Sequence, residues 1–295
     1  MQQKTFAKSA PVLARLYKLA QTIQSGDRAQ VRDAVRSIRR DPIFAGKKGW
    51  KSAFAKLAQT VDTLAPTFSV FATGGNSKLP FVAFSSLPGV TCPGAGSCLD
   101  FCYSFRAWRY PAAFARQAQN AFLMRFNGEA IRSEFRRIAS KRPKGFDFRL
   151  FVDGDFADVL DVAFWMALLA KHPRARAYGY SKSFAELIDY HDSFGGRWPE
   201  NYRLNLSSGY SDDAARKLPV ARTLPIVRGE FVAVSIGRKI KSSDHARPEH
   251  QRLVRAAAGP EKVFACPGKC GSCTPSGHAC GSAKFAGIKI AIAMH

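Results

Sequence analysis

FRLFVDGDFADVLDVAFWMALLAKHPRARAYGYS, residues 148–181, places a strand, a helix and a second strand in succession. Residues 148–152 form a short, mostly apolar run that ends in an Asp-Gly-Asp turn, which is typical of a buried strand. Residues 158–170 are apolar over a helical length, which predicts a helix buried on all sides. Residues 175–181 read as the next strand, so the stretch predicts a βαβ unit and a parallel sheet.

The same alternation continues on both sides of this stretch. Helices are predicted at 111–126, 129–139, 184–190 and 211–218, and further strands at 81–85, 202–206, 223–228, 231–236, 262–265 and 288–293. Strands separated by such helices predict an α/β fold, and six or more units favour a complete or partial (β/α) barrel over an open sheet. In such barrels the chemistry lies at the carboxyl ends of the strands.

The first 65 residues have a different pattern. Apolar side chains recur there at helical spacing among many cations, which predicts three short basic helices at 10–24, 28–40 and 50–64. Pro66 is the predicted boundary between this helical segment, residues 1–65, and a barrel-like domain, residues 66–295. The segment is either a small nucleic-acid-binding domain or an amphipathic extension that packs on the main domain with its charges in solvent.

The chain is strongly basic. It has 45 Lys and Arg against 22 Asp and Glu, a formal net charge of +23. A charge of this size attracts polyanions, so we expect DNA or RNA as a partner, although a solvated basic surface would have the same composition. The charge is densest in residues 1–65.

The composition also limits the class of protein. Apolar residues make up 46% of the chain, which indicates a globular fold. No uncharged apolar run reaches about 18 residues, which predicts that no helix crosses a membrane. The first residues lack the apolar core of a signal peptide, so we expect a soluble, cytoplasmic protein. In that compartment the seven cysteines are expected to be reduced rather than paired in disulfides.

The cysteines fall into two groups with metal-ligand spacing. The first is C-x5-C-x3-C and the second is C-x3-C-x2-C-x6-C. Four thiolates can close a tetrahedral zinc site or ligate every iron of a [4Fe–4S] cluster, whereas three leave one iron open for an external ligand. The three-plus-four pattern favours one or two [4Fe–4S] clusters over zinc. The predicted ligands are Cys92, Cys98 and Cys102 for the open site, and Cys266, Cys270, Cys273 and Cys280 for the second.

Zinc remains the alternative at either group. At the first group it would need a fourth ligand, for which the sequence offers four histidines without obvious local spacing. These are His191, His245, His250 and His278.

Polar residues follow several predicted strands. We expect Asp155, Lys182 and Asn205 to face the open cysteine site, where they are candidates for catalytic roles. Asp153 and Asp155 have an alternative role as caps of the helix that follows them. If the strand ends share one face of the sheet, all seven cysteines neighbour one polar site.

Four short motifs carry a resemblance to a known family. In chain order they are Gly75-Asn76-Ser77-Lys78-Leu79, Cys92-Pro93-Gly94 with Cys98 and Cys102-Tyr103, Asp153-Gly154-Asp155-Phe156, and Cys266-Pro267 with Cys270 and Cys273.

Over about residues 70–281, these motifs resemble the phage and plasmid family called gene product 88. That family is distantly similar to radical S-adenosylmethionine enzymes, which are partial (β/α) barrels with a three-cysteine cluster after the first strand. The resemblance implies a [4Fe–4S] cluster, with S-adenosylmethionine as a candidate cofactor. Phe105 stands where the usual C-x3-C-x2-C motif would place its third cysteine, and Cys92 would substitute from upstream.

Three functions are consistent with the sequence. The first is an iron–sulfur enzyme of a mobile genetic element that acts on or beside nucleic acid. The second is a non-catalytic basic DNA- or RNA-binding protein with a structural zinc or iron–sulfur centre. The third, which depends on the family resemblance alone, is a protein-interaction factor that acts against a host or a competing element.

Overall fold

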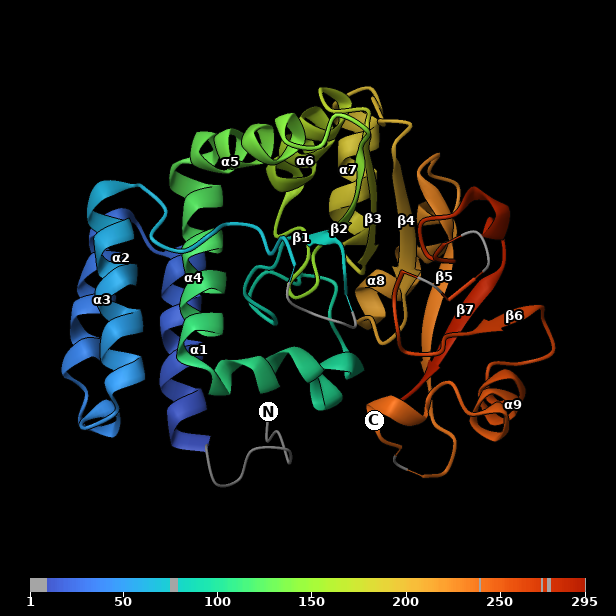
Figure 1. Ribbon diagram of the computed structural model, residues 1–295, viewed down its shortest axis with the longest axis horizontal. Helices are drawn as coiled ribbons and strands as arrows, with labels where there is room; N and C mark the ends of the chain where they lie inside the picture. The colour runs from blue at the N-terminus through green and yellow to red at the C-terminus, as the bar shows by residue number, and fades with distance from the viewer. Residues whose placement is uncertain (1–9, 75–78, 239, 272, 275–276, 295) are drawn as a thin grey trace.

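A computed structural model of the chain describes residues 10–74, 79–238, 240–271, 273–274 and 277–294. The first nine residues, from which the lack of a signal peptide is predicted, lie outside this part of the chain. So do Gly75, Asn76, Ser77 and Lys78 of the first family-like motif. The described elements form a helical group beside an α/β sheet (Figure 1).

The sheet confirms the predicted α/β class. Seven strands within the described ranges form one all-parallel sheet in the order β1-β2-β3-β4-β5-β7-β6. Since every pair is parallel, the carboxyl ends of the strands lie at one edge of the sheet. The strands are β1 Val82–Ala83, β2 Phe146–Leu150, β3 Ala175–Ser181, β4 Tyr202–Ser207, β5 Val227–Val234, β6 Val263–Ala265 and β7 Lys289–Ala293.

Helices connect most of these strands. The βαβ unit read from residues 148–181 is β2, α6 and β3, and Trp165 of α6 packs on Phe148 of β2 and on Phe84. The segment between β6 and β7 is the exception, since it carries the second cysteine group and a single short 3-10 turn. The connecting helices are α4 Pro111–Phe126, α5 Gly128–Ser140, α6 Val159–Ala170, α7 Phe184–Ser193, α8 Asp212–Ala221 and α9 Pro248–Ala257.

Four strand predictions are wrong in detail. The strands predicted at 223–228 and 231–236 are one strand, β5, because a register shift against β4 next to Asn205 lets the chain continue through Gly229. β2 ends at Leu150 because Phe151 has a positive φ of 53°. β1 has only two residues, and α9 was not predicted.

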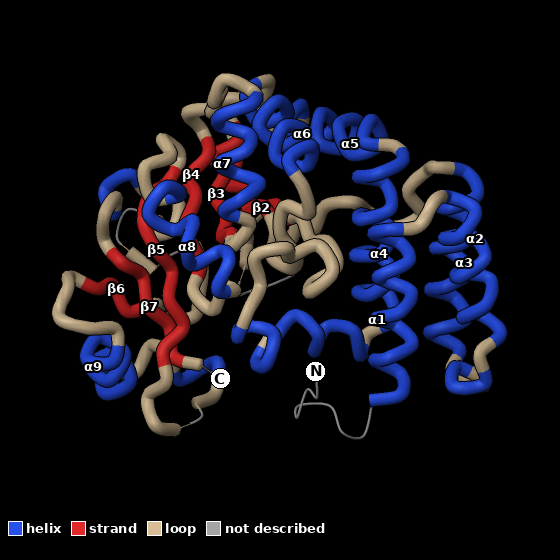
Figure 2. The backbone as a smooth tube through the Cα atoms, turned by 180° about the vertical axis from the view of Figure 1, so that it is seen from behind, coloured by secondary structure: helices blue, strands red, loops and turns tan. Residues whose placement is uncertain are grey.

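The N-terminal helices pack on α4. They are α1 Ala10–Ser25, α2 Arg28–Arg40 and α3 Lys48–Thr63, and they lie on the side of α4 that faces away from the sheet (Figures 1 and 2). Their buried side chains, such as Leu16 and Val61, belong to the same hydrophobic cluster as Phe122 of α4 and Trp165 of α6. The first three helices therefore share a core with the sheet.

None of the helices in the described ranges has the length and apolar character needed to span a membrane.

Candidate metal centre

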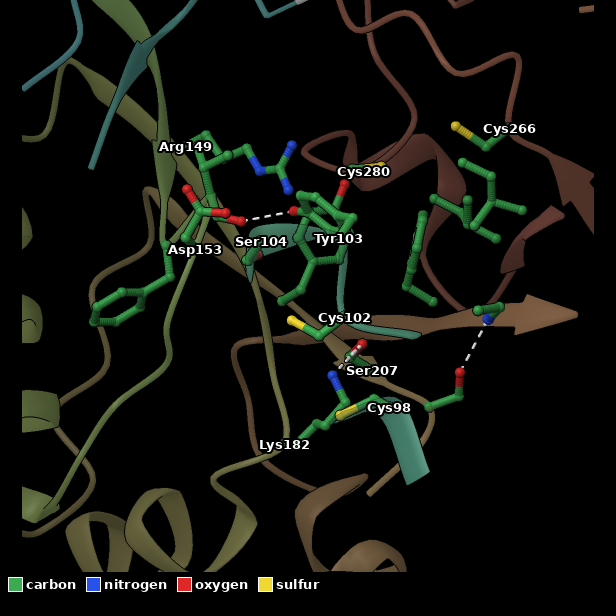
Figure 3. Close-up of a pocket in the computed structure, with 18 of the residues that line it drawn as sticks. Cys98, Cys102, Tyr103, Ser104, Arg149, Asp153, Lys182, Ser207, Cys266 and Cys280 are labelled. Atoms are coloured by element: carbon green, nitrogen blue, oxygen red, sulfur yellow. Dashed lines mark hydrogen bonds between the residues drawn. The ribbon is translucent and has the colours of Figure 1, made fainter. Parts of the chain in front are cut away.

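A cavity of about 450 Å³ lies at the carboxyl ends of the strands. Its wall comes from the loop after β1, the ends of β2, β3 and β4, strands β5 and β7, and β6 with the segment that follows it. Figure 3 shows some of the residues that line it. The cavity brings together both cysteine groups, which are more than 160 residues apart in sequence. The lining cysteines are Cys92, Cys98, Cys102, Cys266, Cys270, Cys273 and Cys280.

The loop of the first group is fixed by backbone pairing to the loop after β4 and approaches the loop after β3 closely. The amides of Gly96 and Cys98 donate to the Gly209 carbonyl at 3.0 and 3.1 Å. Gly94 and Gly96 are glycines of necessity, because a Cβ at Gly94 would stand 1.7 Å from the Lys182 carbonyl oxygen. At Gly96 it would stand 2.3 Å from the Tyr210 carbonyl oxygen. The loop is therefore pressed against the strand ends with no room for side chains there.

The loop of the second group offers backbone donors to its sulfur atoms. The Gly268 amide donates to Cys266 Sγ at 3.4 Å, and the Ala279 amide donates to Cys273 Sγ at the same distance. Gly268 reaches this position with φ +75°. Amide donors to ligand sulfurs are a common feature of iron–sulfur and zinc sites and contribute to the potential of a cluster.

Burial raises the pKa of most of these thiols. It raises the pKa of Cys266 to about 12 and that of Cys280 to about 11, in each case with a further increase from neighbouring thiols of the same group. The pKa of Cys92 is raised further still, first by burial and then by Asp155. The thiols of Cys92, Cys266 and Cys280 therefore stay protonated near neutral pH, and a bound metal would be needed to make them thiolates.

The thiols are not at ligand distance from one another. In the part of the chain that the structure describes, no three His, Cys, Asp or Glu side chains stand close enough together to hold a metal ion. Every cysteine is a free thiol.

Two of the three predicted polar residues line the cavity. Asp155 is 4% exposed and accepts hydrogen bonds from the backbone amides of Lys182 and Phe156 at 2.7 and 2.9 Å. Burial raises the pKa of this carboxyl. Lys182 donates from Nζ to Ser207 Oγ at 3.1 Å (Figure 3).

Neither Asp153 nor Asp155 is the cap of the next helix. Asp158 caps α6, since its side chain accepts from the Asp161 amide. Asp153 lines the cavity and accepts from Gln117 Nε2 at 2.9 Å, and Gln117 in turn accepts from the indole of Trp108.

Asn205 is not among the described residues that line the cavity. It is fully buried on β4, where Nδ2 donates to the carbonyls of Cys280 and Gly179 at 3.0 and 3.1 Å. Arg228 of β5 donates from Nε to Asn205 Oδ1 at 2.6 Å, and from Nη1 to the Phe285 carbonyl. This placement makes Asn205 a support for the backbone of Cys280.

The four candidate histidines also divide into residues that line the cavity and residues that do not. His245 and His278 line the cavity, whereas among its described lining residues neither His191 nor His250 is present. His278 packs on Tyr178 and Phe81, with ring centroids 4.6 and 4.8 Å apart, and burial lowers its pKa.

The sequence reading missed the aromatic and cationic part of the wall. Arg149, Tyr178 and Tyr180 all line the cavity, and the Arg149 guanidinium lies over the Tyr180 ring, 4.9 Å from its centroid. A signal for Arg149 was available, because it is the only charge inside the otherwise apolar run 148–152.

The comparisons with known proteins agree with the motifs. No curated protein and no solved structure gives a significant match to the chain. The family model of gene product 88 matches residues 51–287, from α3 to just before β7, and so covers both cysteine groups and the whole cavity wall up to that point. The chain belongs to the gene product 88 family.

Proposed function

We propose that this protein is a two-centre iron–sulfur enzyme of a mobile genetic element. The first cysteine group would hold a [4Fe–4S] cluster with one iron open to a ligand in the cavity, and the second would hold a fully ligated cluster. The observation that carries the proposal is the convergence of all seven cysteines on one cavity at the carboxyl ends of a parallel sheet.

The residues present fit such clusters. Tyr178 is fully buried, yet its hydroxyl has no hydrogen-bond partner among the described residues. Arg149 Nε is a second buried donor that has no partner among them. Both lie near Cys270, so both could donate to sulfur atoms once a cluster is in place. The Gly-rich cysteine loops would draw together on binding, because the thiols are not yet at ligand distance.

The chain's own residues would define the chemistry at the open site. A reduced [4Fe–4S] cluster supplies one electron to a ligand on its open iron, for which S-adenosylmethionine is the candidate. Lys182 and Ser207 would bind the polar end of that ligand, since they lie beside Cys98 (Figure 3). Asp155 would hold the backbone of Lys182 in place through its 2.7 Å hydrogen bond.

Metal analysis of anaerobically purified protein tests this proposal. We expect about eight irons and eight sulfides per chain, because each cubane cluster contains four of each. Cys102→Ser should lose the iron of the first centre alone, and Cys270→Ser that of the second alone. Protein with zinc and no sulfide would contradict the proposal, as would a single cluster that disappears in both variants.

Binding of S-adenosylmethionine is tested separately. The reconstituted protein should bind it with a change in the electron paramagnetic resonance spectrum of the first cluster, and Cys270→Ser should keep that change. Absence of binding to a fully loaded first centre would remove this cofactor and leave the iron–sulfur assignment intact.

Nucleic-acid binding is a second candidate function, favoured by the end of the α2–α3 hairpin. Six cations are exposed there within 16 residues, and none forms an ion pair with an acidic side chain among the described residues. Such a cluster is typical of a phosphate-binding surface. The cations are Arg36, Arg39, Arg40, Lys47, Lys48 and Lys51.

Salt dependence distinguishes this surface from the remaining positive charge. With short fluorescent DNA and RNA probes, changing Arg36, Arg39 and Arg40 to Gln should reduce the slope of log K against log salt by up to about 2.7 on duplex DNA, or about 0.9 for each lost phosphate contact. The matched control changes Arg252, Arg255 and Lys262, which are exposed near α9, and should leave the slope unchanged. Equal slopes in both triple variants would contradict the assignment.

A further inference from the structure

Arg149 is a half-buried cation of the cavity wall that forms no ion pair with a carboxylate among the described residues. Within the described ranges, no acidic side chain forms an ion pair with its guanidinium, and its buried Nε has no hydrogen-bond acceptor. Asp153 is close enough to interact electrostatically with Arg149, but its carboxylate accepts from Gln117 and forms no ion pair with the guanidinium. A partly buried guanidinium is stabilised by an anion that faces it, so the wall beside Arg149 would favour further negative charge.

The surroundings of Arg149 point to the second cysteine group. Arg149 and Tyr178 are register partners on β2 and β3, so their side chains stand next to each other on one face of the sheet. Arg149 and Tyr178 both lie close enough to Cys270 to interact electrostatically with it. Figure 3 shows the guanidinium extended toward the part of the cavity where Cys280 lies and away from Lys182.

A loaded four-cysteine centre is the anion that fits this place. Four thiolates around either a zinc ion or a [4Fe–4S] core with a charge of about +2 leave a net charge of about −2. A loaded centre would therefore place negative charge beside the Arg149 guanidinium.

We propose that Arg149 is the internal counter-ion of the four-cysteine centre and that, together with Tyr178, it donates hydrogen bonds to the sulfur atoms of that centre. Arg149 is a positioning and tuning residue in this assignment. A neighbouring cation and donors to sulfur both stabilise the reduced, more negative cluster, so they raise its reduction potential. The inference rests on the proposed function, since it requires a metal centre at these four cysteines.

Redox titration of the reconstituted protein tests the proposal. In Arg149→Met the second cluster should bind its electron at least about tenfold more weakly, a shift of about 59 mV to more negative potential for a one-electron couple. Arg149→Lys should have an intermediate potential, because it keeps the charge and loses the fork of donors. The first cluster should be unchanged in both variants.

Arg176→Met is the matched control. Arg176 lies on β3 in an exposed ion pair with Asp147 of β2, so its removal takes away a cation of the same sheet outside the cavity. Its second cluster should titrate as in the parent protein. Equal potentials in Arg149→Met and Arg176→Met would overturn the proposal.

If Arg149→Met does not take up the second centre, metal analysis of Arg149→Lys tests the proposal in place of the redox titration. If Arg149→Lys still takes it up, the requirement is for positive charge and the proposal stands. Loss of the centre in both variants, with the circular dichroism spectrum intact, overturns it.

If the parent protein holds zinc here, the iron–sulfur function fails by itself, and the counter-ion proposal is then tested by the rate at which a chelator removes the zinc. Release should be at least about tenfold faster in Arg149→Met than in Arg176→Met, and equal rates would overturn it.

Discussion

At the scale of single residues, Gly94 determines how closely the first cysteine loop approaches the sheet. Gly94→Ala would place a methyl group against the Lys182 carbonyl. The Gly94 carbonyl is held by the Ser211 amide, and the backbone of Lys182 is held by its own hydrogen bond to Asp155. We expect a loss of about 1–3 kcal/mol of stability, the range for an overpacked site. Iron retention at the first centre should also weaken, and thermal melting with iron analysis measures both.

Gly49→Ala is the control for this change. Gly49 lies in α3, where a Cβ meets Pro111 at an ordinary 3.4 Å. Alanine is the better helix former by roughly 0.5–1 kcal/mol, so this variant should melt at or above the parent temperature. A Gly94→Ala variant that is equally stable would show that the close approach of the loop is not needed.

Asn205 allows a second prediction at this scale. Asn205→Ala leaves the Arg228 Nε and the carbonyls of Cys280 and Gly179 without their partners, each at about 1–3 kcal/mol if it stays buried and unpaired. Asn205→Asp keeps the acceptor for Arg228 and removes the donors to both carbonyls. We expect Asn205→Asp to be the more stable of the two variants while losing the second metal centre as readily. Chemical denaturation and metal analysis test this, and full metal retention in Asn205→Ala would contradict it.

At the scale of elements, the first turn of α6 is predicted to respond to pH. Burial raises the pKa of Asp161 to about 7, against an ordinary value near 3.8, although the Ala157 amide donates to its carboxyl. The folded state therefore holds this proton more tightly than the unfolded state, and this contribution to stability is lost as the pH rises from about 4 to about 7. Asp161→Asn should flatten that decline and gain stability relative to the parent protein at pH 8. Denaturation curves across this range measure it, and parallel declines would contradict it.

The elements also show how far the sequence could be read. Periodicity located most helices and the parallel strands, and strand-end reasoning placed both cysteine groups on one side of the sheet. It failed for Asn205, because the register shift between β4 and β5 depends on tertiary packing rather than on local pattern. The sequence analysis also passed over Arg149. Its charge is unusual in the run 148–152, but the run alone does not show that the strand faces a cavity.

At the scale of the whole molecule, the shared core predicts one unfolding transition. Ile23 of α1 is fully buried in the cluster that extends to Trp165 of α6. Ile23→Ala should cost about 2–5 kcal/mol, the range for a large aliphatic side chain in a core. It should shift the entire transition measured by calorimetry, without releasing the first helices separately. An early, separate melting step for α1–α3 would show instead that they form an independent unit.

The strand order has a consequence for biosynthesis. β7 pairs with β5 on one side and β6 on the other, so the last strand in the sequence is an interior strand of the sheet. While the chain is still emerging from the ribosome, Cys92, Cys98 and Cys102 are available long before their counterparts after β6. The wall that shields both groups closes only when Ala293 has been made. The proposed metal centres would therefore be inserted only after β7 has been made, and the early thiols would be exposed to oxidation until then.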